Sequence, residues 1–292
     1  MSTTGADRGA TRAGTARTGA GDSDAGPAGA TRAEICVVAC AEAWRGDGEI
    51  LAAAMGTCSI LGARLARLTF EPGLLTTDGG ALLTAEPVPI GAPAGPAEGW
   101  MPFRDHLWLV QNGRRHVMMG ASQIDRYGNT NISAIGAWER PASQLLGVRG
   151  APGNTICNPT SYWIPRHSTR VFVPEVDTAS GVGTDRAARL GPRASRFHDL
   201  RRVVTDLGVF DFRAPDGSMR LVSLHPGVDA GEVAAATGFA IHGLAEPAEP
   251  AGPAEPGTGG EVPRTRMPTG EELRLIREVL DPGGLRDREV RA

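Results

Sequence analysis

Residues 116–136 read HVMMGASQIDRYGNTNISAIG and pass directly from an apolar run into a polar one. The first five residues have the apolar character of a buried strand that ends at Gly120. Polar side chains follow at once, at Gln123, Asp125, Asn129 and Asn131. The sequence YGN within this stretch is typical of a turn, so one interpretation is a polar turn between two strands. The other is a loop at the carboxyl end of a strand, where α/β proteins bind ligands.

The composition indicates a folded chain without a charged binding surface. The 292 residues are 41% hydrophobic, enough for one large domain or two small ones. All 30 basic residues are arginine, and the formal net charge is −3. This balance does not favour a nucleic-acid or membrane partner, and we expect neither. Because the chain has no lysine, it supplies no Schiff-base lysine.

The cysteines Cys36, Cys40, Cys58 and Cys157 form no CxxC pair, and no histidine lies at zinc-ligand spacing. We therefore expect no metal site. Cys36 and Cys40 lie one helical turn apart in an apolar segment, and we predict that they are core residues. The sequence shows neither a signal-peptide pattern nor an apolar stretch of about eighteen residues, which predicts a soluble, cytoplasmic protein.

The chain divides into four parts by composition. Residues 1–30 are rich in Gly, Ala, Thr and Arg without periodicity, and we predict a disordered tail. Residues 31–244 form the main domain. Residues 245–263 repeat Ala-Glu-Pro and are predicted to be an extended linker insertion. We expect residues 264–292 to form a helical segment that packs back on the domain.

Helical and strand patterns are mixed along the main domain. Helices are predicted for about residues 32–44, for a segment ending near Leu68 and for residues 229–239. Thr269 and Glu272 have the spacing of a capping box at the start of a C-terminal helix. Strands are predicted for the short apolar runs EILAAA, GLLTT, HVMMG, NISAIG, RVFVPEV and RVVTDLGVFDF. This mixture predicts an α/β fold, an open sheet with flanking helices.

Two further glycine-bearing segments are candidate ligand loops. In LTTDGGALL, residues 75–83, Asp78 ends a strand and is followed by Gly79 and Gly80. In LLGVRGAPGNTICN, residues 145–158, glycine recurs every third residue around Arg149, at Gly147, Gly150 and Gly153. Glycines at strand ends allow backbone N–H groups to approach a ligand and to stabilise an oxyanion.

Four motifs together resemble the beta subunits of family I coenzyme A transferases, especially those of the glutaconate type. These motifs are SQIDRYGNTN, GVRGAPGN, LHPGVDAGEVAAATGF and LIREVLDPGGLRDREV, and the likeness extends from about Arg32 to Arg291. The resemblance implies a CoA transferase-like open α/β sheet. It also implies an alpha subunit of similar fold as partner and an acyl-CoA site at the junction of the two subunits.

At two positions the sequence departs from the transferase pattern. In both it resembles a narrower branch of the family, the steroid ring-cleaving hydrolases of actinobacteria. Asp78 stands where the transferases have their nucleophilic glutamate, and it is shorter by one methylene. Arg149 stands where the glutaconate type has glycine. This branch implies an α2β2 heterotetramer in which the alpha subunit carries the catalytic glutamate. The enzymes of this branch open the last steroid ring, a cyclohexenone carboxyl-CoA thioester, by water addition and retro-aldol cleavage.

Two alternatives stay open at this point. The first is a CoA transferase subunit in which Asp78 is the nucleophile. The second is a non-catalytic partner that completes the site of the alpha subunit. Because water and one acid/base pair suffice for the ring opening, we expect no redox cofactor or metal, and coenzyme A only as part of the substrate.

The candidate site residues follow from these loops. Arg149 is predicted to stabilise an enolate or to pair with a substrate carboxylate. Substrate or CoA binding is predicted for Gly79, Gly80, Gly120, Gln123, Asn131, Gly150, Gly153 and Asn154. Asp125 and Asn129 are predicted to have structural roles in the loop. His106 and His167 give no support for a hydrolytic triad, and no G-x-S-x-G motif occurs, so such a triad is not expected.

Overall fold

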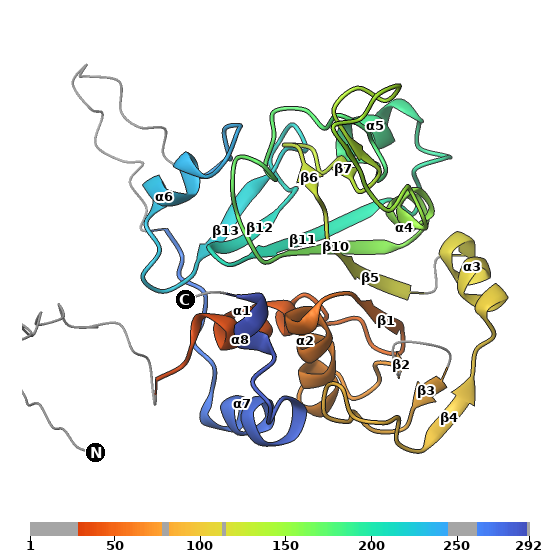
Figure 1. Ribbon diagram of the computed structural model, residues 1–292, viewed down its shortest axis with the longest axis vertical. Coiled ribbons are helices and arrows are strands. Elements are labelled where there is room, and N and C mark those ends of the chain that lie inside the picture. Colours follow the sequence, from red (N-terminus) through yellow and green to blue (C-terminus); the bar gives the residue numbers. More distant parts are fainter. Residues whose placement is uncertain (1–28, 78–81, 113–114, 245–261, 291–292) are drawn as a thin grey trace, which may run out of the picture.

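The computed structural model describes residues 29–77, 82–112, 115–244 and 262–290 (Figure 1). The predicted disordered tail, apart from residues 29 and 30, and the predicted linker, apart from its last two residues, lie outside these ranges. None of the helices in the described ranges is both long and apolar enough to cross a membrane.

A six-stranded sheet forms the centre of the molecule (Figure 1). Its spatial order is β1-β5-β10-β11-β12-β13, in which the first four strands are parallel and the last three form antiparallel hairpins. In that order the strands are Leu51–Ala54, Arg115–Met119, Pro159–Ile164, Asp199–Thr205, Gly208–Asp211 and Arg220–Leu224. Every residue of β5 is buried, as a strand covered on both faces requires.

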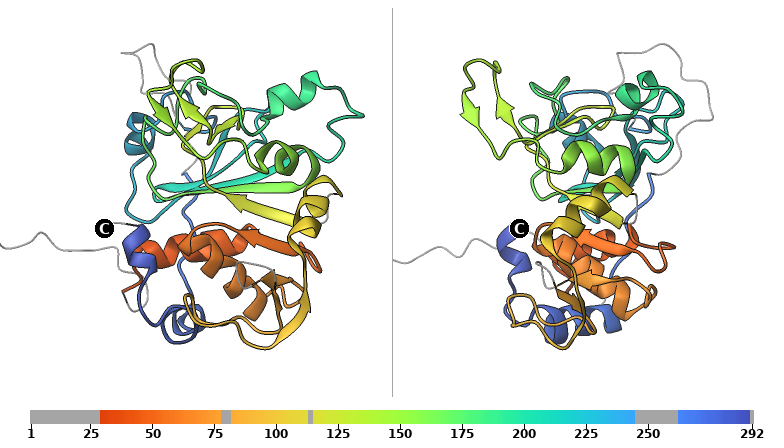
Figure 2. Two further views of the ribbon diagram at one scale, coloured as in Figure 1. Left: turned by 45° about the vertical axis from the view of Figure 1, so that its right-hand side comes forward. Right: turned by 90° about the vertical axis from the view of Figure 1, so that its right-hand side faces the viewer.

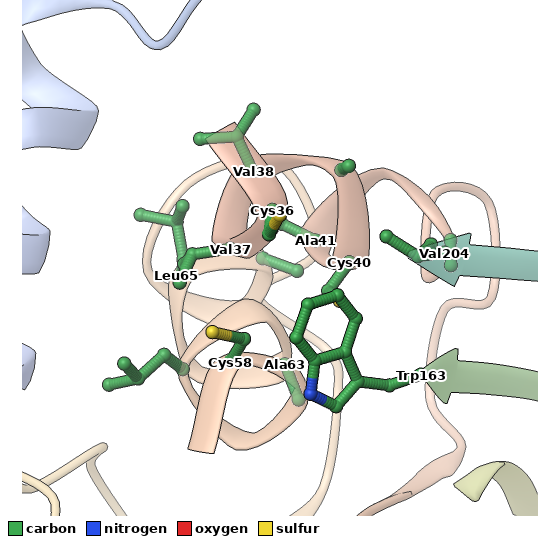
Figure 3. Close-up of a cluster of buried hydrophobic side chains, with 14 of the residues drawn as sticks. Cys36, Val37, Val38, Cys40, Ala41, Cys58, Ala63, Leu65, Trp163 and Val204 are labelled. Carbon is green, nitrogen blue, oxygen red and sulfur yellow. The ribbon is translucent and has the colours of Figure 1, made fainter. Parts of the chain in front are cut away.

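Helices from both ends of the chain cover one face of the sheet. They are α1 (Arg32–Glu42), α2 (Thr57–Leu68), α7 (Gly270–Arg274), the π-helix η1 (Leu275–Leu280) and α8 (Arg286–Glu289). The core beneath this face is built from small side chains of α1 and α2 with Trp163 of β10 (Figure 3). Cys36 and Cys40 are buried free thiols there, as predicted. Cys58 is a third buried thiol in this core, and burial raises the pKa of each of the three.

Short elements and loops cover the other face. They are β6 (Gln123–Ile124), β7 (Thr130–Asn131), β8 (Ala134–Ile135), β9 (Ser143–Gln144), α4 (Ala151–Cys157), α5 (Thr184–Arg189) and α6 (Ala230–Ala235). A second core lies beneath them, around Tyr162, Phe172 and Phe210. A separate three-stranded sheet comprises β2 (Thr76–Thr77), β3 (Leu82–Thr84) and β4 (Ala97–Trp100), and α3 (Phe103–Asn112) follows it.

The α/β open sheet is confirmed, as are most of the predicted elements. The capping box is present, since Thr269 N donates to Glu272 and Glu272 N donates to Thr269 Oγ1. The strand predicted for residues 170–176 is wrong: the segment forms only an isolated bridge between Phe172 and Ile124, and Pro174 carries no N–H to continue a ladder. NISAIG is divided between β7 and β8, and RVVTDLGVFDF between β11 and β12.

Candidate active site

The chain leaves β5 at the exposed Gly120 and enters a turn organised by Asp125. The Oδ1 atom of Asp125 accepts hydrogen bonds from the backbone N–H groups of Tyr127 and Asn129, both at 3.0 Å. Its Oδ2 atom accepts from Asn129 Nδ2 at 2.9 Å. Burial raises the pKa of Asp125, and these hydrogen bonds oppose that increase. The side chain therefore organises the turn, which is the structural role expected of it.

Asn129 joins this turn to a second loop around residues 177–185. Its Nδ2 atom donates to Asp185 Oδ1 at 2.9 Å, and its Oδ1 atom accepts from the backbone N–H of Gly183 at 2.8 Å. An open groove of about 680 Å³ adjoins this junction and is lined by residues that include Asp125, Asn129 and Asp185. Neither Gln123 nor Asn131 lines the groove.

Gln123 and Asn131 face each other across the paired strands β6 and β7. Asn131 Nδ2 donates to Gln123 Oε1 at 2.7 Å, and the same oxygen accepts from the backbone N–H of Asp177 at 3.1 Å. Both side chains are buried. In the single chain these contacts brace the loop, and the ligand-binding role of the two residues stays a prediction. The opening stretch is thus a polar turn whose side chains hydrogen-bond mainly within the protein.

Substitution of Gly128 tests how tightly this turn is built. Gly128 has a φ of +80°, and an added Cβ would lie 2.7 Å from atoms of Leu200 and Phe212. We expect Gly128→Ala to lower the free energy of unfolding by roughly 2 kcal/mol, because it combines backbone strain with a clash in the core. Urea unfolding measures the change, and an unaltered midpoint would contradict the described turn.

Arg149 has an unusual backbone conformation. Its φ is +46°, and within the described ranges it is the one non-glycine residue with a positive φ. The side chain is exposed. A left-handed backbone at a long side chain costs on the order of 1 kcal/mol or more, and such strain concentrates at functional sites. The glycine that the transferase pattern has at this position would adopt the same conformation without strain.

The predicted glycine loop ends sooner than expected, because residues 151–157 form α4 with Gly150 as the N-cap. Gly153 lies inside this helix, and a Cβ there would lie 2.4 Å from Val110 Cγ1, so glycine is required for packing against α3. Asn154 is buried and accepts hydrogen bonds from the Arg115 guanidinium rather than facing open space. The loop prediction for this helical part is wrong, and the structure gives Gly153 and Asn154 packing roles.

Asp78, Gly79 and Gly80 lie outside the described residues. The strands on either side are described: β2 ends at Thr77, as predicted, and pairs antiparallel with β3. Arg67 of α2 holds this pair in place by donating to Thr76 Oγ1 at 3.1 Å and to the Thr84 carbonyl at 3.0 Å. The role of this arginine was not predicted from the sequence.

Three residues that are distant in sequence form a buried network at the amino ends of β5 and β10. His116 Nδ1 lies 2.6 Å from Asp47 Oδ2, and His116 Nε2 lies 2.9 Å from Ser161 Oγ. The groups are those of a hydrolytic triad, which the sequence did not predict, but the His116 and Ser161 side chains are fully buried. Burial lowers the pKa of His116 although Asp47 raises it. Without access for a substrate, the network is structural.

His167 and His225 predict a pH dependence of stability. Burial lowers the pKa of His167 from 6.5 to about 3 and that of His225 to about 4. Below pH 6.5 the unfolded chain binds protons that the folded chain excludes, so stability falls as the pH is lowered from 6.5 toward 4. We expect His167→Gln to reduce the slope of unfolding free energy against pH by about one proton. Urea titrations at several pH values measure this slope, and an unchanged slope would contradict a neutral buried His167.

In the described part of the chain, no three His, Cys, Asp or Glu residues are placed to hold a metal ion.

No model of a known protein family matches the sequence. The cholesterol ring-cleaving hydrolase IpdB subunit of Rhodococcus jostii RHA1 is 56% identical over 260 residues, which cover 89% of this chain and 96% of that protein.

The chain belongs to the IpdB family. The IpdB subunit of Mycobacterium tuberculosis H37Rv is 52% identical over 90% of this chain and 99% of that protein. The crystal structure of R. jostii IpdAB superimposes with a TM-score of 0.82 at 55% identity and covers 90% of this chain and 99% of that one.

The wider CoA transferase relationship is more distant. A 3-oxoadipate CoA-transferase subunit of Pseudomonas knackmussii is 32% identical over 74% of this chain and 81% of that protein. Glutaconate CoA-transferase of Acidaminococcus fermentans shares the fold, with a TM-score of 0.70 at 22% identity over 87% of this chain and 96% of that one. The resemblance to CoA transferase beta subunits is therefore confirmed, and the IpdB family is the nearer match.

Proposed function

We propose that this chain is the IpdB-type subunit of a hydrolase that opens the last ring of a degraded steroid. Its substrate is a cyclohexenone that carries a carboxyl-CoA thioester. The observation that carries the proposal is 56% identity extending over 96% of a cholesterol ring-cleaving hydrolase IpdB subunit. Because the solved relative is the two-subunit IpdAB, we infer a CoA transferase-like alpha partner that carries the catalytic glutamate in an α2β2 assembly.

The reaction needs water, a base and a group that stabilises negative charge. A hydroxyl adds to the far carbon of the conjugated alkene, and the electrons move to an enolate that is then protonated. The resulting alcohol lies beta to the carbonyl groups. Removal of its proton breaks the ring carbon–carbon bond, which leaves a ketone on one carbon and an enolate on the other. The base returns the proton to this enolate, so the net change is the addition of one water. The thioester stays intact, and we expect neither a metal nor a redox cofactor to take part.

Arg149 is the residue of this chain that we assign to charge stabilisation. Its guanidinium is permanently charged and exposed on a strained backbone, where it can pair with the enolate or with a substrate carboxylate. A cation that meets the developing charge lowers the barrier, because that charge is largest in the transition state. We assign no covalent step to Asp78, because an aspartate is one methylene shorter than the transferase glutamate.

Co-expression with the alpha subunit tests this assignment. We expect the purified pair to consume the cyclohexenone carboxyl-CoA and neither chain alone to do so. Turnover by the alpha subunit alone would instead make this chain a non-catalytic partner. Movement of CoA to an added carboxylate acceptor would identify a transferase with Asp78 as nucleophile. We place the reaction in the cytoplasm, where free thiols such as those of this chain persist.

A further inference from the structure

Arg115 is a buried arginine whose hydrogen bonds go to one side chain of α4. It is the first residue of β5, and 7% of its surface is exposed. Its Nε atom donates to Asn154 Oδ1 at 3.1 Å, and its Nη2 atom donates to the same oxygen. Burial lowers the pKa of Arg115, and no carboxylate among the described residues opposes that change. A hydrogen bond from a charged donor is strong where water is excluded, so Asn154 is firmly held.

Helix α4 depends on tertiary contacts for its position. It has seven residues, too few for a stable helix on its own. Near its carboxyl end, Val182 N donates to Thr155 Oγ1 at 2.9 Å, and Asn158 Nδ2 donates to the Val110 carbonyl at 2.8 Å. In the first turn Gly153 packs against Val110 but has no side chain that could fix the rotation of the helix. Both views of Figure 2 show α4 (green) beside α3 (yellow).

Asn154 connects Arg115 to the residues just before α4. Its backbone N–H donates to the Gly150 carbonyl at 2.9 Å, and its Nδ2 atom lies 3.3 Å from the position that a Cβ on Gly150 would have. Gly150 is the N-cap and offers no side chain to cap the helix. Arg149 precedes it with a φ of +46°. A strained backbone of this kind persists only where the surrounding structure holds it, and the bond from Arg115 to Asn154 lies one helical turn away.

We propose that Arg115 is a positioning residue for ring opening: by fixing Asn154 it holds the first turn of α4 and keeps Arg149 where it meets the developing charge. This inference rests on the proposed function, which gives Arg149 its role. A catalytic group that is misplaced by about 1 Å can lose on the order of 100-fold in rate, so a contact one helical turn away affects the reaction.

Arg115→Met tests this role in the complex with the alpha subunit. Methionine fills a similar space without hydrogen-bond donors. We expect kcat to fall about 10-fold or more and KM to stay within about twofold, because Arg149 acts on charge that is largest in the transition state. Arg64→Met is the matched control. Arg64 is 9% exposed and donates to the Val88 carbonyl at 2.7 Å, on the opposite face of the sheet, and its loss is expected to leave kcat and KM unchanged.

Combination with Arg149→Gly separates positioning from a general structural role. When Arg149 is already glycine, we expect Arg115→Met to lower kcat by less than about twofold, because the side chain that it positions is gone. The same loss in both backgrounds would overturn the proposal and show a general distortion of the chain. A higher KM at unchanged kcat would also overturn it, in favour of substrate binding by Arg115 itself.

Hydrogen exchange of the two-subunit complex tests the contact without reference to activity. We expect the amides in the first turn of α4 to exchange about 10-fold faster or more in Arg115→Met and at the unmodified rate in Arg64→Met. Arg115→Lys retains the charge and provides a second variant if Arg115→Met does not fold, with intermediate exchange expected. Unchanged exchange in the Arg115 variants would overturn the positioning role. Faster exchange, together with an unmodified complex that does not open the ring, contradicts the proposed function and leaves the hold on α4 supported.

Discussion

Replacing Arg149 with glycine is expected to reduce ring opening at least 100-fold and to leave the folded chain as stable as before or slightly more stable. The loss follows from removing a cation that stabilises negative charge as it develops in the transition state. The stability is retained because φ = +46° is strained for arginine and unstrained for glycine. Steady-state kinetics of the heteromeric complex together with urea unfolding measure both quantities.

Two controls accompany this substitution. Arg193→Gly removes an exposed arginine elsewhere on the surface and is expected to leave activity unchanged. Arg149→Lys retains the positive charge without the planar fork of the guanidinium, so we expect an intermediate rate. Full activity of Arg149→Gly in an intact complex would remove Arg149 from the mechanism.

Replacing Glu34 with alanine is expected to be among the most destabilising changes in the chain, at about 3 kcal/mol. The side chain is fully buried and receives hydrogen bonds from Arg277 and Arg286 of the C-terminal segment, at 2.7 to 3.0 Å. It also closes the capping box of α1 with Thr31. Removing one partner of a buried ion pair leaves the other charges without compensation, and the lost cap adds to that cost.

The pKa of Glu34 gives this result a pH dependence. Burial alone raises the pKa, but the hydrogen bond from Arg277 and the nearby positive charges lower it below the ordinary 4.5. The carboxylate therefore contributes stability above pH 4.5, and the contribution is lost as the pH falls through the folded pKa. Urea unfolding at pH 7 measures the change, and Glu271→Ala, an exposed ion pair on α7, is the control. Equal effects of the two substitutions would contradict the buried pair.

Local sequence signals predicted much of the fold. The apolar periodicity of α1 and α2, the capping box at Thr269 and the apolar run of β5 all depend on residues close in sequence. Strands β10 and β13 were missed because polar residues interrupt them: Thr160 and Ser161 are buried inside β10. Tertiary contacts make that burial possible, and a local pattern does not contain them.

The site was predictable in part for the same reason. Asp125 and Asn129 act within one turn, so their role followed from turn chemistry. The partnership of Arg115 with Asn154 spans 39 residues, and the link between His116 and Asp47 spans 69. No spacing rule relates such positions. Asn154 was expected to bind ligand because of its place in the glycine loop, and that role stays a prediction. The left-handed backbone of Arg149 was likewise not evident, although its position among glycines marked the loop.

The mass of the product formed in ¹⁸O-labelled water tests the central claim most directly. The purified pair of subunits is incubated with the cyclohexenone carboxyl-CoA, and the acyl-CoA pool is followed by mass spectrometry. We predict a ring-opened product that still carries CoA and has gained one water containing ¹⁸O. An acid that has lost CoA and carries ¹⁸O in its carboxylate, with the ring intact, would contradict ring hydrolysis and show cleavage of the thioester instead.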